Sequence, residues 1–462
     1  MISEKRWIII NQKRTKEKIK NSSKKTLIFS IPKFGTSILM GFADFALATL
    51  YILGYQVSSI FVGVALGLGK LTIAGSQFFF GWISDYKYTR WGRRKPYLII
   101  LSPILGISFI FLLLPGLLLD LSNPFTLFLW LLFWYQIFNL SYGITSPYQS
   151  WMVEQFDSNS RPKASQYQNT IGFFGTAVTT IFSFIVLPNF SDKIEDNPGV
   201  IPPEFLYSVI LFGIIVIILF YLTAFLMPTE SYHKIESSSV ERLKVILKNK
   251  NYLMVTGMVG LASIAWIMVG SLVLLFIENV LQFEQIFYYI TAGIFLIGIL
   301  LFLYLWRKLI IKLGKKRTLL YIFLFAIITL PFSLLGLVPM NNLSFIYGLI
   351  FVSALTGCLG GWFLLPNILY ADIAEDDQMK TGELKAGTYQ GFPSIILNLF
   401  QSIGLILMGF ILELPEISIK SSDVSIGYVL WGPICALILI GVYFYSKKFL
   451  LLDFDWESNK NS

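Results

Sequence analysis

Long runs of apolar residues, separated by short polar segments, recur along the whole chain. A helix needs about 20 mostly apolar residues to cross the hydrocarbon core of a bilayer. This criterion predicts an all-α membrane protein with twelve transmembrane helices. The predicted spans are Leu27 to Leu53, Ser58 to Ile83, Pro96 to Leu119, Phe125 to Tyr148, Tyr167 to Leu187, Phe205 to Leu226, Tyr252 to Ile277, Ile286 to Leu305, Leu319 to Val338, Leu343 to Tyr370, Gly387 to Leu412 and Ile426 to Tyr445.

The polar segments between these runs predict the topology. Of the 36 Lys and Arg residues, 33 are assigned to the termini and the loops after even-numbered spans, with Lys33, near the start of the first run, grouped with the basic N-terminal region. Two (Lys193 and Lys420) lie in the other loops, and one, Lys70, lies deep inside a span. Because cytoplasmic loops collect Lys and Arg, we expect both termini in the cytoplasm. The longest loop, 228–251, is then cytoplasmic and separates an N-terminal bundle (1–227) from a C-terminal bundle (252–462).

Composition supports a multi-pass protein, which we expect in the plasma membrane as a monomer. The chain has 462 residues, of which 55% are hydrophobic and 14% charged. Its net charge of +9 lies in loops rather than on one face of a domain, so we expect no nucleic-acid partner. The single His233 lies in a polar loop, and Cys358 and Cys435 lie in apolar runs. We therefore expect no metal site, no cofactor and no enzymatic activity.

A basic island follows the second span. It reads Gly81-Trp-Ile-Ser-Asp85, and then Arg90-Trp-Gly-Arg93-Arg94-Lys-Pro. Asp85 is placed to accept hydrogen bonds from these arginines. A similar glycine-centred basic turn follows span eight, at 312–317, and such a repeat indicates two six-helix bundles that alternate access to a central site.

This island and three further stretches resemble the glycoside-pentoside-hexuronide:cation symporter family of the major facilitator superfamily, to which sucrose transporters are related. The other stretches are Pro147-Tyr148 followed by Glu154 and Arg161, the loop from Ala371-Asp372 to Gly387, and Gly69 with Gln77. The resemblance implies a sugar transporter that works by alternating access. It also implies a gating role for Asp85, Arg90, Arg93, Arg94 and Asp372.

The chain departs from the melibiose permeases of this family at their charged site positions. The sodium-coordinating aspartates fall on Ile73 and Gln77, and the other positions fall on Met40, Thr145, Asn169 and Asn398. A hard cation needs several oxygen ligands, and Ile73 offers none. The departures therefore favour a proton over sodium as the coupling ion.

Asp44 and Lys70 are identified as the two charged residues deep inside predicted spans. A charge near the bilayer centre is costly and usually faces a cavity or a partner of opposite sign. Counted from the span ends, the two residues differ in depth by roughly 5 Å, so an ion pair between the first two spans is reasonable. Two interpretations remain: Asp44 binds a proton or a substrate hydroxyl, or the pair only fixes helix packing.

Other polar or aromatic residues could complete a pocket: Gln77, Gln136, Asn139, Tyr142, Gln168, Asn169, Asn367, Tyr389, Gln390, Asn398, Trp134 and Trp266. The polar groups among them can bind hydroxyls, and we expect a secondary active transporter, a symporter, of a small polyhydroxylated solute such as a glycoside or disaccharide. One alternative is a transporter of a lysolipid or other amphiphile on the same fold. Another is a membrane sensor or partner-binding protein that transports nothing.

Overall fold

The structure is a computed structural model that describes residues 23–86, 88–156, 160–196, 201–229, 247–283, 285–337, 344–381, 393–419 and 422–452. Within these residues, 12 helices are long and apolar enough to cross a membrane. They coincide with the twelve predicted spans, so the predicted fold class is confirmed.

The first six spans are formed by the helices that precede the long central loop. They comprise α2 (Pro32–Phe45) with α3 (Leu47–Thr49) and the π-helical turn η1 (Leu50–Gly54), α4 (Ser59–Tyr86), α5 (Lys95–Leu113) with the short turn η2 (Pro115–Leu117), α6 (Pro124–Tyr142) continued by α7 (Thr145–Gln155), α8 (Arg161–Asp196) and α9 (Pro203–Leu226). The first span also includes the helical residues before α2, from Ser23 onward.

The last six spans follow the central loop. They comprise α11 (Lys250–Phe276) with η3 (Ile277–Leu281), α12 (Gln285–Leu313), α13 (Lys315–Thr329) with η4 (Leu330–Leu337), α14 (Ser344–Thr381), α16 (Pro393–Leu412) and α17 (Gly427–Phe449). A short antiparallel hairpin, β1 (Glu416–Ile419) and β2 (Ser422–Ser425), connects the last two helices.

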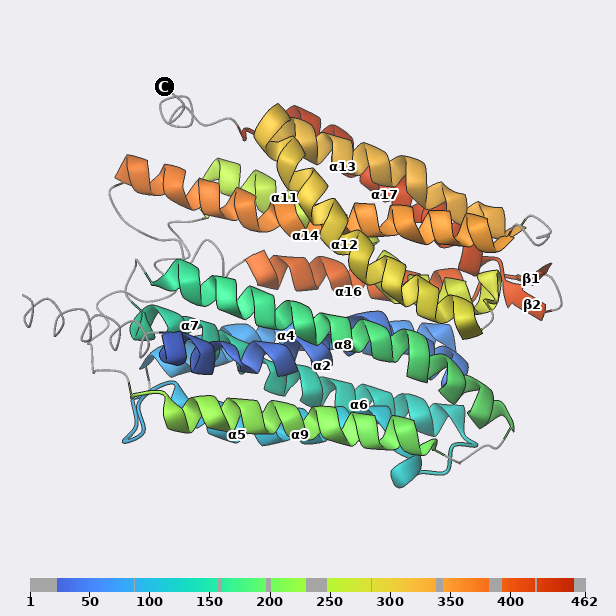
Figure 1. The fold of residues 1–462 in the computed structure, drawn as a ribbon, viewed down its shortest axis with the longest axis horizontal. Helices are drawn as coiled ribbons and strands as arrows, with labels where there is room; N and C mark the ends of the chain where they lie inside the picture. Colours follow the sequence, from blue (N-terminus) through green and yellow to red (C-terminus); the bar gives the residue numbers. More distant parts are fainter. Residues whose placement is uncertain are drawn as a thin grey trace, which may run out of the picture.

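These helices form two bundles that lie side by side (Figure 1). The blue and green helices of the first bundle lie below the yellow and orange helices of the second, and α16 lies between them against α4. Within the first bundle α2 packs on α8 and α9, and in the second α11 packs on α16 and α17. We call the end where α4 and α12 finish and α5 and α13 begin the basic end, and the other the opposite end.

Side-chain caps help to set where some of these helices begin. Asn123 precedes α6, and its side-chain oxygen accepts hydrogen bonds from the backbone N–H groups of Phe125 and Thr126 at 3.0 and 3.2 Å. Asn249 does the same for Tyr252 at the start of α11, at 3.1 Å. The first N–H groups of a helix have no partner inside it, so these caps fix the polar ends of otherwise apolar segments.

Candidate functional site

The predicted ion pair between the first two spans is present. The Nζ atom of Lys70 on α4 lies 2.6 Å from Oδ1 of Asp44 on α2. The two side chains are not equally buried: that of Lys70 is 3% exposed and that of Asp44 is 36% exposed. A carboxylate inside a transmembrane segment is costly to expose to lipid, so one that is one-third accessible is expected to face a cavity or the bundle interior.

Asp44 also lies where the two bundles meet. Ser271, on the first helix of the second bundle, donates a hydrogen bond from its hydroxyl to the backbone carbonyl of Asp44 at 3.0 Å. A backbone contact of this kind holds α2 beside α11 without using the carboxylate. The side chain of Asp44 therefore keeps one oxygen for Lys70 and leaves the other accessible.

Neutral hydrogen bonds join α4 to α6 and α7, and they include two positions, Gln77 and Thr145, that align with acids of the melibiose permeases. The Gln77 amide donates to Thr145 Oγ1 at 3.2 Å, and Thr145 in turn donates to the carbonyl of Tyr142 at 2.9 Å. One turn earlier Thr72 donates to the side-chain oxygen of Gln136. Ile73 is buried between them. The structure thus brings Gln77 and Thr145 together as an amide and hydroxyl pair.

The two remaining site candidates lie apart from this pair. Asn169 is exposed on α8. Asn398 is 6% exposed on α16 and donates to the carbonyl of Ser394 in its own helix at 2.7 Å. The amide of Asn398 is therefore hydrogen-bonded within its own helix, whereas the side chain of Asn169 is exposed on the surface of α8.

Most other pocket candidates have structural partners. Asn139 donates to the Tyr135 carbonyl at 2.8 Å, and Gln168 donates to the Tyr148 hydroxyl at 2.8 Å. Trp134 stacks on Phe111 within the first bundle, with ring centroids 4.7 Å apart, and Trp266 stacks on Trp362 in the second, at 5.7 Å. Tyr142 is 8% exposed. Tyr389, Gln390 and the side chain of Asn367 lie outside the described residues.

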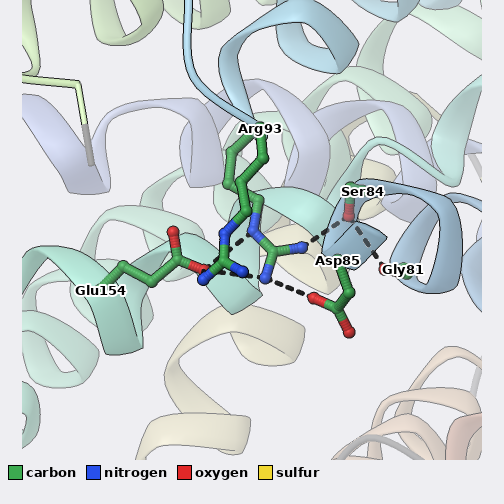
Figure 2. A network of polar contacts seen from close by, with 6 residues as sticks. Gly81, Ser84, Asp85, Arg93 and Glu154 are labelled. Atoms are coloured by element: carbon green, nitrogen blue, oxygen red, sulfur yellow. Dashed lines mark hydrogen bonds and ion pairs between the residues drawn. The ribbon is translucent and has the colours of Figure 1, made fainter. Parts of the chain in front are cut away.

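The first basic turn, residues 88–95, forms a buried network of charges (Figure 2). Arg94 donates to Ser84 at 2.6 Å, to Asp85 at 2.5 Å and to Glu154 at 2.8 Å, and Arg93 donates to the same Glu154 oxygen at 2.7 Å. This network joins the end of α4 to α7. The expected contact between Asp85 and the arginines is confirmed.

Arg90 does not belong to this network. Its guanidinium lies over the neighbouring Trp91 ring, 5.4 Å from the centroid, and the side chain is exposed. The prediction that grouped Arg90 with Arg93 and Arg94 is corrected in this respect. Arg90 precedes Gly92, and Arg93 and Arg94 follow it; the positive φ of Gly92, 95°, turns the chain between them.

The second basic turn has the same construction in the other bundle. Gly314 also has a positive φ, of 82°, and Lys315 after it pairs with Asp372 on α14 at 2.7 Å. Lys95 donates to the carbonyl of Met227, just past α9, and Lys316 donates to that of Leu450, just past α17, at 2.7 and 2.8 Å. Each turn therefore ties the fourth and sixth spans of its own bundle together, which confirms the sequence repeat.

Close contacts between the bundles lie at and beyond the level of Asp44, toward the opposite end. A Cβ atom on Gly63 of α4 would lie 2.6 Å from the Leu405 carbonyl of α16. Phe45 and Phe184 contact Phe295 across the bundles at centroid distances of 5.6 and 6.0 Å. Ser58 donates to Glu413 at 2.6 Å. Among the described residues, the hydrogen bonds, ring contacts and glycine contacts between bundles are confined to this region, which we call the seal.

The sequence analysis missed the structural role of two charged residues, Lys33 and Glu154. Lys33 was grouped with the basic N-terminal region, but the structure places it in α2, ten residues after the start of the first span. Its position inside the predicted run Leu27 to Leu53 could have identified it as a charge within the first span. Glu154 was noted as part of a resemblance, but its contact with both arginines depends on the fold.

Comparison with known proteins gives a family and a fold. A family model described as MFS/sugar transport protein matches residues 28–447. No curated protein matches the sequence significantly. Among solved structures, a D-xylose-proton symporter has 13% identity and a TM-score of 0.64, with 93% of this chain and 97% of that chain covered.

Two further structures have the same architecture. The nucleoside transporter NupG has 14% identity and a TM-score of 0.60, covering 92% of this chain and 98% of that chain. A bacterial homologue of the human lysosomal transporter Spinster, in an inward-facing and unoccupied conformation, has 14% identity and a TM-score of 0.60, covering 93% of this chain and 96% of that chain. At these identities the likeness concerns the fold alone.

Proposed function

The chain belongs to the MFS/sugar transport protein family, and on that premise we propose that it is a proton-coupled symporter of a small polyhydroxylated solute, such as a glycoside or disaccharide. The observation that carries this proposal is the pair of Asp44 and Lys70. An accessible carboxylate in the middle of a span, held by a buried cation, can take up and release a proton as its surroundings change.

The ion pair gives the proton a means of changing the helix packing. When Asp44 is ionised, its attraction to Lys70 holds α2 against α4. Protonation removes that attraction and leaves the buried ammonium without a counter-charge, a costly arrangement that favours rearrangement of the two helices. Proton binding and helix movement are thereby coupled through one contact.

Sodium is a poorer coupling ion for this arrangement. Gln77 and Thr145 satisfy each other with a neutral hydrogen bond, and Ile73, at the family's other sodium-ligand position, is buried and has no oxygen in its side chain. A sodium ion would have to displace that hydrogen bond and would gain no carboxylate. We therefore propose transport that is insensitive to sodium.

The basic turns and the seal support alternating access between two states. The seal holds the bundles together at and beyond Asp44, and each basic turn has ion pairs within its own bundle. If the basic end is cytoplasmic, as the charge distribution predicts, this is an inward-facing state of a plasma-membrane protein. We place the bundle boundaries at 1–227 and 252–462, with 228–251 as the connecting loop.

A ligand screen on the purified protein tests this proposal. Thermal unfolding is measured with a panel of glycosides and disaccharides, at two pH values and with or without sodium, because a specific ligand stabilises the folded state. Transport of the most stabilising sugar is then measured in proteoliposomes with an imposed pH gradient. We expect accumulation that follows the proton gradient and ignores sodium. Saturable stimulation by sodium would contradict the proposal.

A further inference from the structure

Lys33 is a second cation within the first span, and its place in the fold differs from that of Lys70. Ten residues separate it from Ser23, where the span begins, which is about 15 Å along a helix. Asp44 lies eleven residues further along the same span, so Lys33 is nearer the basic end than Asp44 is. The side chain is partly buried, and no described residue pairs with its ammonium group by an ion pair or a hydrogen bond.

A cation at this depth needs a negative partner at some stage of its working cycle. An unpaired charge inside a membrane protein is costly, and such residues usually face a pathway or an opposite charge. Lys70 meets this need with Asp44 at 2.6 Å. Among the described residues nothing does the same for Lys33, so an anion from outside the protein is the simplest partner.

Lys33 lies on the same face of α2 as Asp44. The two residues are eleven positions apart in one helix, which is close to three full turns, so they lie on one face of α2. They are separated by about 17 Å along that face. Asp44 is accessible on this face, so if the proposed function holds, the solute meets the face of α2 that carries both residues.

Two groups that can donate hydrogen bonds lie on the two helices that meet at Lys33. Its stem lies against Gly172 on α8, where a Cβ atom would be 3.1 Å from Lys33 Cγ and 3.0 Å from Ser37 Oγ. Asn169 lies on α8 one turn before Gly172 and is exposed. An ammonium, a hydroxyl and an amide placed together suit an oxyanion, which accepts several hydrogen bonds at once.

We propose that Lys33, together with Ser37 and Asn169, binds an anionic group of the transported solute, a carboxylate or a phosphate. This inference rests on the proposed transport function and narrows its substrate class to anionic solutes. Ser37 and Asn169 supply neutral donors, and Lys33 supplies the charge that distinguishes an anionic solute from its neutral counterpart.

The test compares matched ligands on matched variants. Binding of glucose, glucuronate and glucose 6-phosphate is measured by thermal unfolding of the purified protein, and lysophosphatidate is added to the protein in lipid nanodiscs as an amphiphilic anion. The variants are Lys33→Gln, Lys33→Arg and, as a control for net charge, Lys163→Gln, whose side chain is exposed on α8.

We expect the wild type to prefer an anionic sugar to glucose by about tenfold or more, the usual effect of one hydrogen bond to a charged group. Lys33→Gln should lose that preference, while Lys33→Arg and Lys163→Gln should keep it. If lysophosphatidate is the only ligand whose binding depends on Lys33, the result supports the anion site but contradicts a sugar substrate.

Other outcomes separate this inference from the proposed function. If a sugar binds and Lys33→Gln weakens glucose and its anionic forms equally, or weakens neither, the anion site is refuted and sugar transport stands. If none of these probes stabilises the wild type but a neutral glycoside or disaccharide of the ligand screen does, the anion site is refuted and sugar transport stands. If no sugar of either set stabilises the wild type, both proposals are contradicted.

Discussion

The two partners of the ion pair differ in exposure, and this difference decides what each substitution does. Lys70 is 3% exposed and Asp44 is 36% exposed. Removal of Asp44 leaves a cation in a dry site, whereas removal of Lys70 leaves a carboxylate that water can reach. The larger loss of stability should therefore follow the removal of Asp44, because that substitution leaves the buried Lys70 charge without a partner.

Asp44→Asn should lower stability more than Lys70→Met does. We expect a loss of about 3 kcal/mol for Asp44→Asn, which strands a buried charge, and about 1 kcal/mol or less for Lys70→Met, which strands an accessible one. The double variant should recover most of the loss. Unfolding of the purified variants measures this, and single effects that simply add in the double variant would show that the charges do not pair.

The Asp44 and Lys70 pair could be predicted from the sequence because charges are rare inside spans, so the few that occur are informative. Lys33 was not recognised as a charge inside a span because it lies near a basic terminus, where a charge count cannot distinguish a loop residue from one already inside the helix. The partners of Arg93 and Arg94 could not be derived either. Glu154 is about sixty residues away, and only the packing of α7 against α4 brings it to the turn.

At the ends of the helices, the two basic turns share one local structure, which occurs once in each bundle. Each turn has a glycine with positive φ, then a cation that pairs with an acid of the fourth span of its bundle. In the first turn Arg94 is buried in this network and Arg90 is exposed outside it. The two arginines are therefore a matched pair for testing what the network does.

Arg94→Gln should change the balance of access states, while Arg90→Gln should not. Loss of the contacts to Asp85 and Glu154 should alter transport turnover by about tenfold, equivalent to about 1.4 kcal/mol in that balance. Substrate affinity should change little, because the turn lies far from Asp44. Initial transport rates over a range of substrate concentrations separate the two quantities, and equal effects of both variants would refute a gating role.

The seal offers a second comparison, between two glycines of α4. A Cβ atom on Gly63 would press on the Leu405 carbonyl at 2.6 Å, whereas one on Gly75 would have no neighbour within 4 Å. Close approach of helix backbones in membranes depends on such small residues. Gly63→Ala should therefore separate α4 from α16, and Gly75→Ala should not.

The reporter for this separation is a cysteine at Ser402, a buried residue of α16 beside Gly67. We expect Gly63→Ala to speed its reaction with a small thiol reagent by about tenfold, an opening change of about 1.4 kcal/mol. The native Cys358 and Cys435 are fully buried and give a low background. Equal reaction rates in both glycine variants would mean that this contact does not hold the seal.

At the scale of the whole molecule, the number and order of the helices could be predicted because each span is long and apolar enough to be recognised alone. The access state could not. It depends on which contacts between bundles are made, such as Phe45 with Phe295, and the same sequence must support a state with those contacts broken.

Orientation in the membrane is a prediction that labelling can test. Thr229 is exposed at the basic end, after α9, and Ser122 is exposed at the opposite end, before α6. On intact cells a membrane-impermeant maleimide should label a cysteine at Ser122 and should label one at Thr229 only after permeabilisation. The reverse pattern would place the termini outside.

The central claim is that Asp44 carries the coupling proton, and one comparison tests it directly. Asp44→Asn is studied in proteoliposomes with the sugar that the ligand screen identifies, and Asp120→Asn, an exposed loop carboxylate beside Ser122, serves as the control. Asparagine mimics the permanently protonated acid. Asp44→Asn should therefore lose accumulation against a gradient but keep exchange of sugar across the membrane, which needs no net proton movement. Full accumulation driven by a pH gradient in Asp44→Asn would contradict the claim.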